Sequence, residues 1–333
     1  MVIAFIMEES NKQSPNILKP TTMTTSSTLY GDLSGVEFRS LFSNGKMDGC
    51  LVTEPNQLIT PYGTIVPQYE AEDMGRRSVK PLYFYKDGSL KSVALQSQTI
   101  LETPVGALPA ELITFHKNGA IKRLFPLDGK LSGFWGWKNE FALATELTIN
   151  SPVGTLTAKM IGLQFYESGA LKSITLWPGQ TLTVPTPMGE ITVRKGLAFY
   201  ESGAIKSFEP LTKLAIETPI GTITSYDNEP NGIHGDINSV QLSEAGEIEA
   251  LSTVDHAVQV SLSGESGKLF HPGVKNNVCG DERKVSVPMK IRFDKRWVMF
   301  HDNPQLSFDL ERYRFEVKMM DKTTKEPAYS CAG

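Results

Sequence analysis

Two short sequence elements alternate along the middle of the chain, and this repetition constrains the fold more than any other feature. The first element is an apolar residue, three variable residues and a glycine, followed by a small residue, an aliphatic residue and lysine. It occurs at Phe84–Lys91, Phe115–Lys122, Phe165–Lys172 and Phe199–Lys206, with weaker copies at Leu41–Gly45 and Leu242–Gly246. The second element, Thr/Ser-Pro-x-Gly, occurs at Thr60–Gly63, Thr103–Gly106, Ser151–Gly154, Thr186–Gly189 and Thr218–Gly221. Such self-similarity indicates stacked units that bury a shared core.

The spacing between the glycines of the two elements is regular. It is 18 residues in three copies, counted from Gly45, Gly88 and Gly203 to the following Gly63, Gly106 and Gly221. It is 20 residues in the copy that starts at Gly169 and 35 in the copy that starts at Gly119. The longest copy therefore carries an insertion, which contains the aromatic stretch 133–139.

Each element has the residues of a hairpin turn. Proline in Thr-Pro-x-Gly presets φ near −65°, and glycine adopts the left-handed conformation that a turn followed by a bulge needs. The segments between the turns are short and rich in β-branched residues, as in Leu182-Thr-Val184. We therefore expect an all-β chain. Its main part is an elongated antiparallel β-hairpin repeat array, either solenoid-like or a twisted meander, of about six units in residues 36–251.

The two ends of the chain lack the repeat. Residues 1–35 are rich in Ser, Thr, Asn and Pro, and we expect a partly disordered N-terminal arm. Residues 252–333 predict a non-repeat C-terminal β cap. Within it, residues 284–293 alternate between polar and apolar side chains, which predicts one half-buried strand. Pro288 cannot donate to a strand ladder, so we expect this strand at an edge. No stretch predicts a helix.

Phe165-Tyr-Glu-Ser-Gly-Ala-Leu-Lys172 and Phe199-Tyr-Glu-Ser-Gly-Ala-Ile-Lys206 resemble the MORN repeat in its bacterial variant, Tyr-Tyr-x-x-Gly-x-Leu-Lys. The resemblance covers about nine residues in each of four units. It implies stacked β-hairpins in an elongated, twisted sheet, and a role as scaffold, binding module or toxin-neutralising partner. The chain departs from the family in its longer period, in the added Thr-Pro-x-Gly hairpin and in the missing Tyr-x-Gly core.

Composition excludes several classes of protein. The 33 basic and 37 acidic residues give a net charge of −4, which does not favour nucleic acid as a partner. The three cysteines lack Cys-x-x-Cys spacing, so we expect neither a disulfide framework nor a zinc site, and no cofactor. No apolar run reaches the ~18–20 residues of a membrane span. We expect a cytoplasmic protein.

Alternation along a strand places Phe199 and Ile205 on one face of a hairpin, and Tyr200 and Lys206 on the other. The apolar column formed in this way predicts the shared core, and comprises Leu41, Phe84, Phe115, Phe165, Phe199 and Leu242. The opposite face carries the candidate binding residues Tyr85, Tyr166, Tyr200, Lys91, Lys172 and Lys206. This face could bind a glycan or an anionic polymer through stacking and charge. Alternatively, the lysine stems lie over the tyrosine rings and only solubilise the sheet.

Trp135 and Trp137 in the insertion are the other candidate binding residues. Insertions in repeat proteins map to loops, where exposed aromatic side chains serve as interface anchors. Alternatively, the two side chains fill a gap that the longer loop creates.

Catalytic signals are sparse. A carboxylate lies near a histidine at His234 and Asp236, at Asp255-His256 and at His301-Asp302, but no nucleophile motif or third ligand has a diagnostic spacing. The sequence therefore favours a non-enzymatic β-repeat scaffold or binding module for a protein partner. The alternatives are glycan or anionic-polymer binding through the Tyr/Lys/Trp surface, and a hydrolase with a His/Asp loop site.

Overall fold

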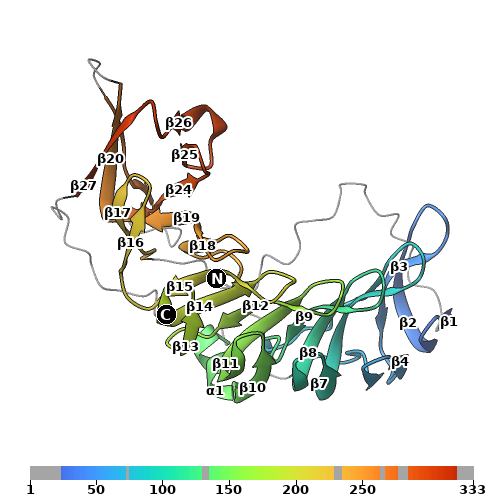
Figure 1. Cartoon of the computed structure of the whole chain (residues 1–333). Helices are drawn as coiled ribbons and strands as arrows, with labels where there is room; N and C mark the ends of the chain where they lie inside the picture. The colour runs from blue at the N-terminus through green and yellow to red at the C-terminus, as the bar shows by residue number, and fades with distance from the viewer. Residues whose placement is uncertain are drawn as a thin grey trace. The chain divides into compact units, whose positions relative to one another are not determined.

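A computed structural model describes residues 24–72, 75–129, 135–228, 235–262, 267–276 and 284–320. The prediction of an all-β chain built from antiparallel hairpins is confirmed, with 59% of the described residues in strands and 4% in helices (Figure 1). The chain forms two compact units. Unit 1 comprises Met1–Leu182, Glu201–Gly203 and Gly232–Gly235, and unit 2 comprises Thr183–Tyr200, Ala204–Asn231 and Asp236–Gly333. The division lies within the predicted array of residues 36–251.

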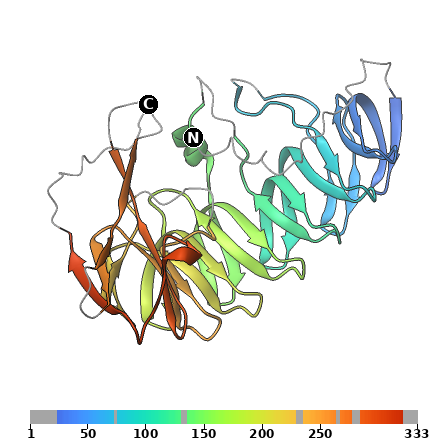
Figure 2. The same ribbon diagram turned by 90° about the horizontal axis from the view of Figure 1, so that it is seen from above.

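Unit 1 consists of hairpins that follow one another in chain order (Figures 1 and 2). Neighbouring strands pair in the order β1–β2–β3–β6–β7–β8–β9–β11–β12, while β10 pairs with the first half of β11 and β4 pairs with β5. The elements are β1 (Thr24–Thr28), β2 (Gly31–Leu41), β3 (Met47–Val52), β4 (Leu58–Thr60), β5 (Gly63–Ile65), β6 (Leu82–Phe84), β7 (Leu90–Thr103), β8 (Gly106–Phe115), β9 (Ile121–Phe125), α1 (Trp137–Leu143), β10 (Glu146–Ser151), β11 (Gly154–Phe165) and β12 (Leu171–Leu176).

Unit 2 continues the hairpins and then adds strands without the repeat. Its main sheet has the order β14–β15–β18–β19–β24–β25–β26, beside the three-stranded sheet β21–β20–β27 and the hairpins β16–β17 and β22–β23. The elements from the unit boundary onward are β13 (Thr181–Thr186), β14 (Gly189–Phe199), β15 (Ile205–Pro210), β16 (Leu214–Thr218), β17 (Gly221–Ser225), β18 (Val240–Leu242), β19 (Ile248–Thr253), β20 (His256–Ser261), β21 (Lys268–Phe270), β22 (Gly273–Asn276), β23 (Lys284–Val287), β24 (Met289–Phe293), β25 (Trp297–Phe300), η2 (Pro304–Leu306), β26 (Ser307–Asp309) and β27 (Arg314–Met319).

The Thr/Ser-Pro-x-Gly element forms a hairpin turn as predicted, but the predicted bulge after it is absent, because its first and fourth residues pair directly and the strands continue without a register shift next to the turn. A hydroxyl closes the turn. In each copy the Thr or Ser hydroxyl donates to the glycine carbonyl, as from Thr103 to Gly106 at 2.6 Å. The same bond occurs in a copy that the sequence analysis missed, from Thr28 to Gly31 at 2.7 Å, where leucine replaces proline. The expectation of an arm through residue 35 is therefore wrong from Thr24 onward, because threonine and serine there form the β1–β2 hairpin. Residues 1–23 lie outside the described residues.

The other turn element ends in a β-bulge. Phe165 pairs with Leu171 but Gln164 pairs with Ser173, so Lys172 has no residue opposite it. The same register shift follows the glycine turn in six hairpins. Gly169, with φ of 90°, supplies the left-handed residue that such a turn requires. The repeated lysine is therefore the bulge residue of each full copy.

The predicted apolar column is buried in five of its six positions. Phe84, Phe115, Phe165, Phe199 and Leu242 are at most 3% exposed. The prediction is wrong for Leu41, which is 48% exposed. Leu41 belongs to the β2–β3 hairpin, the first with this turn element, and lies beyond Val36, where the pairing of β2 with β1 ends.

Two expectations about single elements are also wrong. Residues 284–293 do not form one edge strand, because the strand ends at Pro288. β23 then pairs with β22, while β24 is paired on both sides, by β19 and β25. The insertion also contains the helix α1, which was not expected because its seven residues are too few to show a helical period.

Candidate functional site

The tyrosines of the Tyr/Lys surface join consecutive hairpins. The hydroxyl of Tyr85 donates to the carbonyl oxygen of Phe115 at 2.8 Å, and Nε2 of His116 lies 3.0 Å from the carbonyl oxygen of Phe165. In unit 2, the hydroxyl of Tyr200 donates to the carbonyl of Leu242 at 2.8 Å. Each side chain thus reaches the column residue of the next hairpin, so this position has a structural role in stacking the repeats.

The lysines cover the rings of these tyrosines. Nζ of Lys91, Lys172 and Lys206 lies 5.8, 6.0 and 5.3 Å from the ring centroids of, respectively, Tyr85, Tyr166 and Tyr200. Contacts at these distances are cation–π interactions. The arrangement favours the interpretation in which the lysine side chains shield the rings, because a ligand that stacked on a ring would have to displace its lysine.

The turns of consecutive hairpins also contact each other. The Asn118 side chain donates to the carbonyl of Glu167 at 2.9 Å, and Asn44 donates to that of Lys86 at 3.3 Å. In addition, Pro152 packs so close to Gly203 that a Cβ there would lie 3.1 Å from the Cβ of Pro152. Asparagine, proline and glycine of the turns therefore help to fix the spacing between hairpins.

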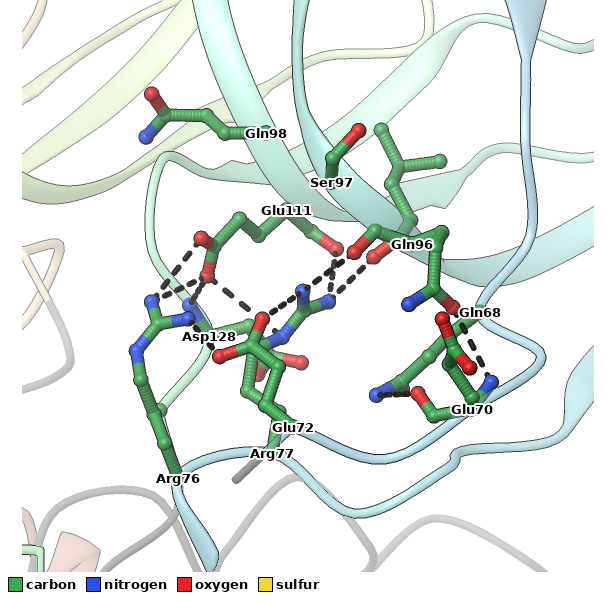
Figure 3. A network of polar contacts seen from close by, with 12 residues as sticks. Gln68, Glu70, Glu72, Arg76, Arg77, Gln96, Ser97, Gln98, Glu111 and Asp128 are labelled. Atoms are coloured by element: carbon green, nitrogen blue, oxygen red, sulfur yellow. Dashed lines mark hydrogen bonds and ion pairs between the residues drawn. The ribbon is translucent and has the colours of Figure 1, made fainter. Parts of the chain in front are cut away.

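The candidate functional site of unit 1 is a buried cluster of charged side chains, which we call the ionic clasp (Figure 3). It forms where the loop between β5 and β6 meets β8, the loop after β9 and the insertion helix α1. Its members are Glu72, Arg76, Arg77, Lys80, Glu111, Asp128 and Glu140.

Arg76 lies at the centre of the ionic clasp and is 7% exposed. Its Nη1 is 2.7 Å from Glu72, and its Nη2 is 2.8 Å from Glu111 and 3.3 Å from Glu140. Its guanidinium carbon also lies 5.9 Å from the ring centroid of Trp135. Arg76 therefore joins three segments of the chain that are far apart in sequence.

Arg77 is 1% exposed, and its side chain donates hydrogen bonds to backbone carbonyls that lack a partner strand. β7 contains a wide bulge, because Ala94 pairs with Leu112 while the next paired residue is Thr99. Nη2 of Arg77 donates to the carbonyl of Leu95 at 2.6 Å, and Nη1 donates to that of Gln96 at 3.4 Å. These bonds satisfy carbonyls of the bulge that would otherwise be buried without a partner.

Glu140 is the one buried residue of α1, and it fastens the insertion to the sheet. Its carboxylate accepts hydrogen bonds from the backbone N–H of Gly129 and the indole N–H of Trp135, both at 2.7 Å. A Cβ on Gly129 would lie 1.9 Å from Oε2 of Glu140, so only glycine leaves room for the carboxylate. The insertion thus brings a carboxylate to Arg76.

The two candidate tryptophans have different environments. Trp135 is half-buried and its indole N–H is bonded within the ionic clasp, which agrees with the gap-filling interpretation. Trp137 is half-buried at the start of α1, with Nζ of Lys138 6.0 Å from its ring centroid. A binding role for Trp137 remains a prediction. Residues 130–134 lie outside the described residues.

Burial and ion pairing act in opposite directions on the carboxyl groups of the ionic clasp. Burial raises the pKa of Glu111 and of Asp128, although Arg77 and Lys80 respectively oppose this rise. Glu72 is partly buried, but hydrogen bonds from Arg76 and Arg77 bring its pKa below the usual range. The cluster has four carboxyl groups and three cationic side chains, and each cationic side chain pairs with a carboxylate of the cluster. This geometry holds loops in place and is not that of a substrate site.

Unit 2 contains a second buried set of charges. Lys195 has a φ of 60° and its Nζ donates to the carbonyl of Ile237. Glu209, 1% exposed, accepts a hydrogen bond from the backbone N–H of Ser239 at 2.8 Å. Burial lowers the pKa of Lys195 and raises that of Glu209. The sequence analysis missed both residues, because neither lies in a recognisable motif.

The His/Asp candidates do not form a catalytic geometry in the described part of the chain. Asp255 pairs with Lys213 at 2.7 Å, and Nδ1 of His256 accepts a hydrogen bond from the backbone N–H of Thr224 at 3.3 Å. Asp302 pairs with Lys290 and Arg292. His234 lies outside the described residues.

The described residues contain no group of three or more His, Cys, Asp or Glu side chains arranged to hold a metal ion. No helix among them has the length and apolar character needed to cross a bilayer. Burial raises the pKa of the Cys50 thiol to about 12, which makes it a poor nucleophile.

Comparisons with known proteins found no matching family model, no matching curated protein and no matching solved structure. The similarity to MORN repeats therefore remains an expectation from the sequence, and no function transfers from a relative.

The stacking role of Tyr85 predicts the effect of removing its hydroxyl. Tyr85→Phe deletes the bond to the carbonyl of Phe115, and we expect the free energy of unfolding to fall by about 1 kcal/mol. Urea denaturation measures this change. Tyr83→Phe is the matched control, because no hydrogen bond of the Tyr83 hydroxyl occurs in the described structure. Equal stability of the two variants would contradict the stacking role.

The close approach at Gly129 predicts that Gly129→Ala displaces the Glu140 carboxylate from the ionic clasp. Arg76 would lose a buried partner, and we expect a loss of about 3 kcal/mol in the free energy of unfolding. Gly136→Ala is the control, because its Cβ would meet only Asn139 Oδ1, at 3.5 Å. Near-UV circular dichroism should report the altered environment of Trp135 in Gly129→Ala alone. An unchanged spectrum and stability would refute the anchoring role of Glu140.

The raised pKa of Glu111 predicts a pH dependence. A carboxyl group with a raised pKa in the folded state stabilises the fold most below its unfolded pKa of about 4.3, and this contribution is lost as the pH rises through the folded pKa. Glu111→Gln lacks this titration. We therefore expect the stability of the natural protein, relative to Glu111→Gln, to decrease between pH 4 and neutral pH in denaturation experiments. A relative stability that increases over this range would mean that attraction to the arginines outweighs burial.

Proposed function

We propose that this protein is a non-enzymatic β-repeat scaffold that binds a protein partner. The observation that carries the proposal is the structural use of the polar side chains. The tyrosine and histidine side chains bond consecutive hairpins, and the cationic side chains of the ionic clasp all pair with carboxylates of the clasp. These groups stiffen the repeats, and a rigid repeated surface needs no chemistry to bind another protein.

Exposed apolar side chains on the hairpins support this proposal. Ile59 on β4 is 72% exposed and Ile100 on β7 is 62% exposed. Both lie in unit 1, and β7 also contacts β5, the hairpin partner of β4. Exposed apolar residues on neighbouring hairpins are suited to the partly apolar contact surface of a protein partner. The MORN-like class and a cytoplasmic location are parts of the same proposal.

A second candidate function is the binding of a glycan or an anionic polymer. Lys91, Lys122 and Lys206 are exposed bulge residues and offer positive charge along the hairpins. The covered tyrosine rings weigh against stacking on a sugar. The hydrolase alternative has less support, because Asp255 is paired with a lysine.

The proposal is tested by affinity enrichment with the full chain from its source cells, followed by calorimetry with each purified candidate partner. We expect saturable binding to a protein, and no binding on a glycan array. The matched variants are Lys91→Gln, Lys206→Gln and Trp137→Ala. Glycan binding that these variants abolish would replace the proposal with the second candidate function.

A further inference from the structure

The first hairpin of unit 1 has an outer strand edge without a partner among the described residues. β2 pairs with β1 only from Gly31 to Val36, and its other side pairs with β3. The segment Glu37–Leu41 therefore has one open side in the described structure. Phe38 and Leu41 in this segment are 46% and 48% exposed. The segment offers both unpaired backbone groups and apolar side chains, and such an edge can template pairing with another chain.

One position in this segment differs from all equivalent positions. Two residues before the apolar column, the other hairpins carry buried aliphatic residues, namely Leu82, Ile113, Leu163, Leu197 and Val240, all at most 2% exposed. The first hairpin carries Arg39 there, and Arg39 is exposed. Its guanidinium forms no ion pair in the described part of the chain. Glu37 is the nearest acidic residue along the strand, while Asp48 on β3 accepts a hydrogen bond from Ser40 at 3.4 Å.

The repeats define the register of a strand that would add to this edge. Leu82 pairs with Cys50, and Leu163 pairs with Leu124. In unit 2, Val240 pairs with Phe208. The partners Cys50, Leu124 and Phe208 each lie three positions after the first residue of their strand, in β3, β9 and β15 respectively. Each of these strands is the second strand of the preceding hairpin. A strand added to β2 in the same register would place one residue directly opposite Arg39.

The last repeat hairpin, β18–β19 in unit 2, shows how this chain closes an end of the repeats. Glu249 occupies the position at which the full copies carry lysine. The non-repeat strand β24 adds to β19 there, with Arg292 opposite Ala250. Arg292 also forms an ion pair with Glu249 at 3.5 Å. The added strand β24 thus places the positive Arg292 beside the negative Glu249, which stands where the full copies carry lysine.

Arg39 also departs from the repeat, at a different position of its hairpin, and charge complementarity of the kind seen between Glu249 and Arg292 calls for an acidic residue opposite it. Building on the proposed function, we propose that the outer edge of Glu37–Leu41 binds an extended strand of a partner protein with an acidic residue opposite Arg39. Backbone hydrogen bonds would supply affinity, as in other cases of strand addition to a sheet edge. Cross-strand pairing with Arg39 would supply selectivity, because opposite charges attract and like charges repel at directly opposed positions. Apolar residues of the partner strand would cover Phe38 and Leu41.

Labelled peptides and the full chain test this proposal by fluorescence anisotropy. The probe has the sequence of Ala170–Trp177 with glutamate in place of Ile174, which is the third residue after the start of β12. The control peptide has lysine at the same place. We expect the glutamate peptide to bind roughly five- to tenfold more tightly than the lysine peptide.

Protein variants assign the binding to this edge. Arg39→Glu should reverse the preference between the two peptides. Arg314→Glu should leave the preference unchanged. Arg314 is also an exposed arginine, but it lies on β27, an edge strand that pairs only with β20 among the described strands. Absence of saturable binding, or equal affinity for the two peptides, would overturn the proposal. So would binding that is seen only after deletion of residues 1–23, because the chain itself would then cover the edge.

Two further measurements separate this proposal from the proposed function. Sedimentation velocity should find a monomer, and a dimer that Arg39→Glu dissociates would assign the edge to a second copy and refute an acidic partner. A protein partner found by enrichment should bind Arg39→Glu at least several-fold more weakly. A partner that binds the variant with unchanged affinity would refute the docking edge and leave the scaffold function intact.

Discussion

The fold depends on the bulge that follows the left-handed glycine of the first turn element, as after Gly169. A strand exposes alternate residues on its two faces, so one extra residue reverses the face for everything beyond it. In every full copy of the repeat this extra residue is the lysine. The bulge lets the aliphatic residue after the turn and the residue three positions further on both lie in the core, as for Leu171 and Ile174, which pair with Phe165 and Leu163. It also places the lysine beside the ring of the preceding tyrosine. The arrangement of the Tyr/Lys surface is thus a consequence of the turn.

The ionic clasp follows from a second irregularity, the wide bulge in β7. Backbone carbonyls of the bulge lack strand partners, and Arg77 provides donors for two of them. A buried arginine requires carboxylates, because an unpaired charge in the interior costs several kcal/mol. Glu111 lies on β8, next to the bulge, whereas Glu140 lies on α1 in the insertion. The longest copy of the repeat is therefore long because it completes a cluster that begins one hairpin earlier. Binding does not have to be invoked to explain it.

The sequence predicts the repeated part of this structure well, because the two turns are local. Proline, glycine and the flanking alternation determine each hairpin, and they occur within about ten residues. Contacts between distant segments leave no such pattern. Arg76 and Glu140 are separated by 64 residues in the sequence. Nothing in the spacing of Arg76, Arg77 and Glu140 predicts that they belong to one cluster. Trp135 stood out in the sequence as a binding residue, yet its indole N–H is bonded to Glu140.

Conversely, the Thr28–Gly31 turn was missed because leucine replaces proline, although threonine and glycine keep their spacing. Leu41 matched the apolar column by pattern, but burial depends on a neighbouring strand, and β1 pairs with β2 only as far as Val36.

Residues in the end hairpins of a repeat array indicate what lies next to the array, whereas residues in the interior hairpins do not. Interior positions are constrained by neighbours of the same kind, so an aliphatic residue at Leu82 or Leu163 reports only on packing. A residue at an end has no such neighbour, and a departure from the repeat there reflects whatever lies next to it. For Glu249 that neighbour is visible, since β24 supplies Arg292. Arg39 is a departure at the first repeat hairpin, at the position where the other hairpins carry a buried aliphatic residue. A charged residue on an exposed strand edge also hinders indiscriminate pairing. The same side chain can therefore exclude apolar strands and select an acidic one, and these two effects are what specificity at an open edge requires.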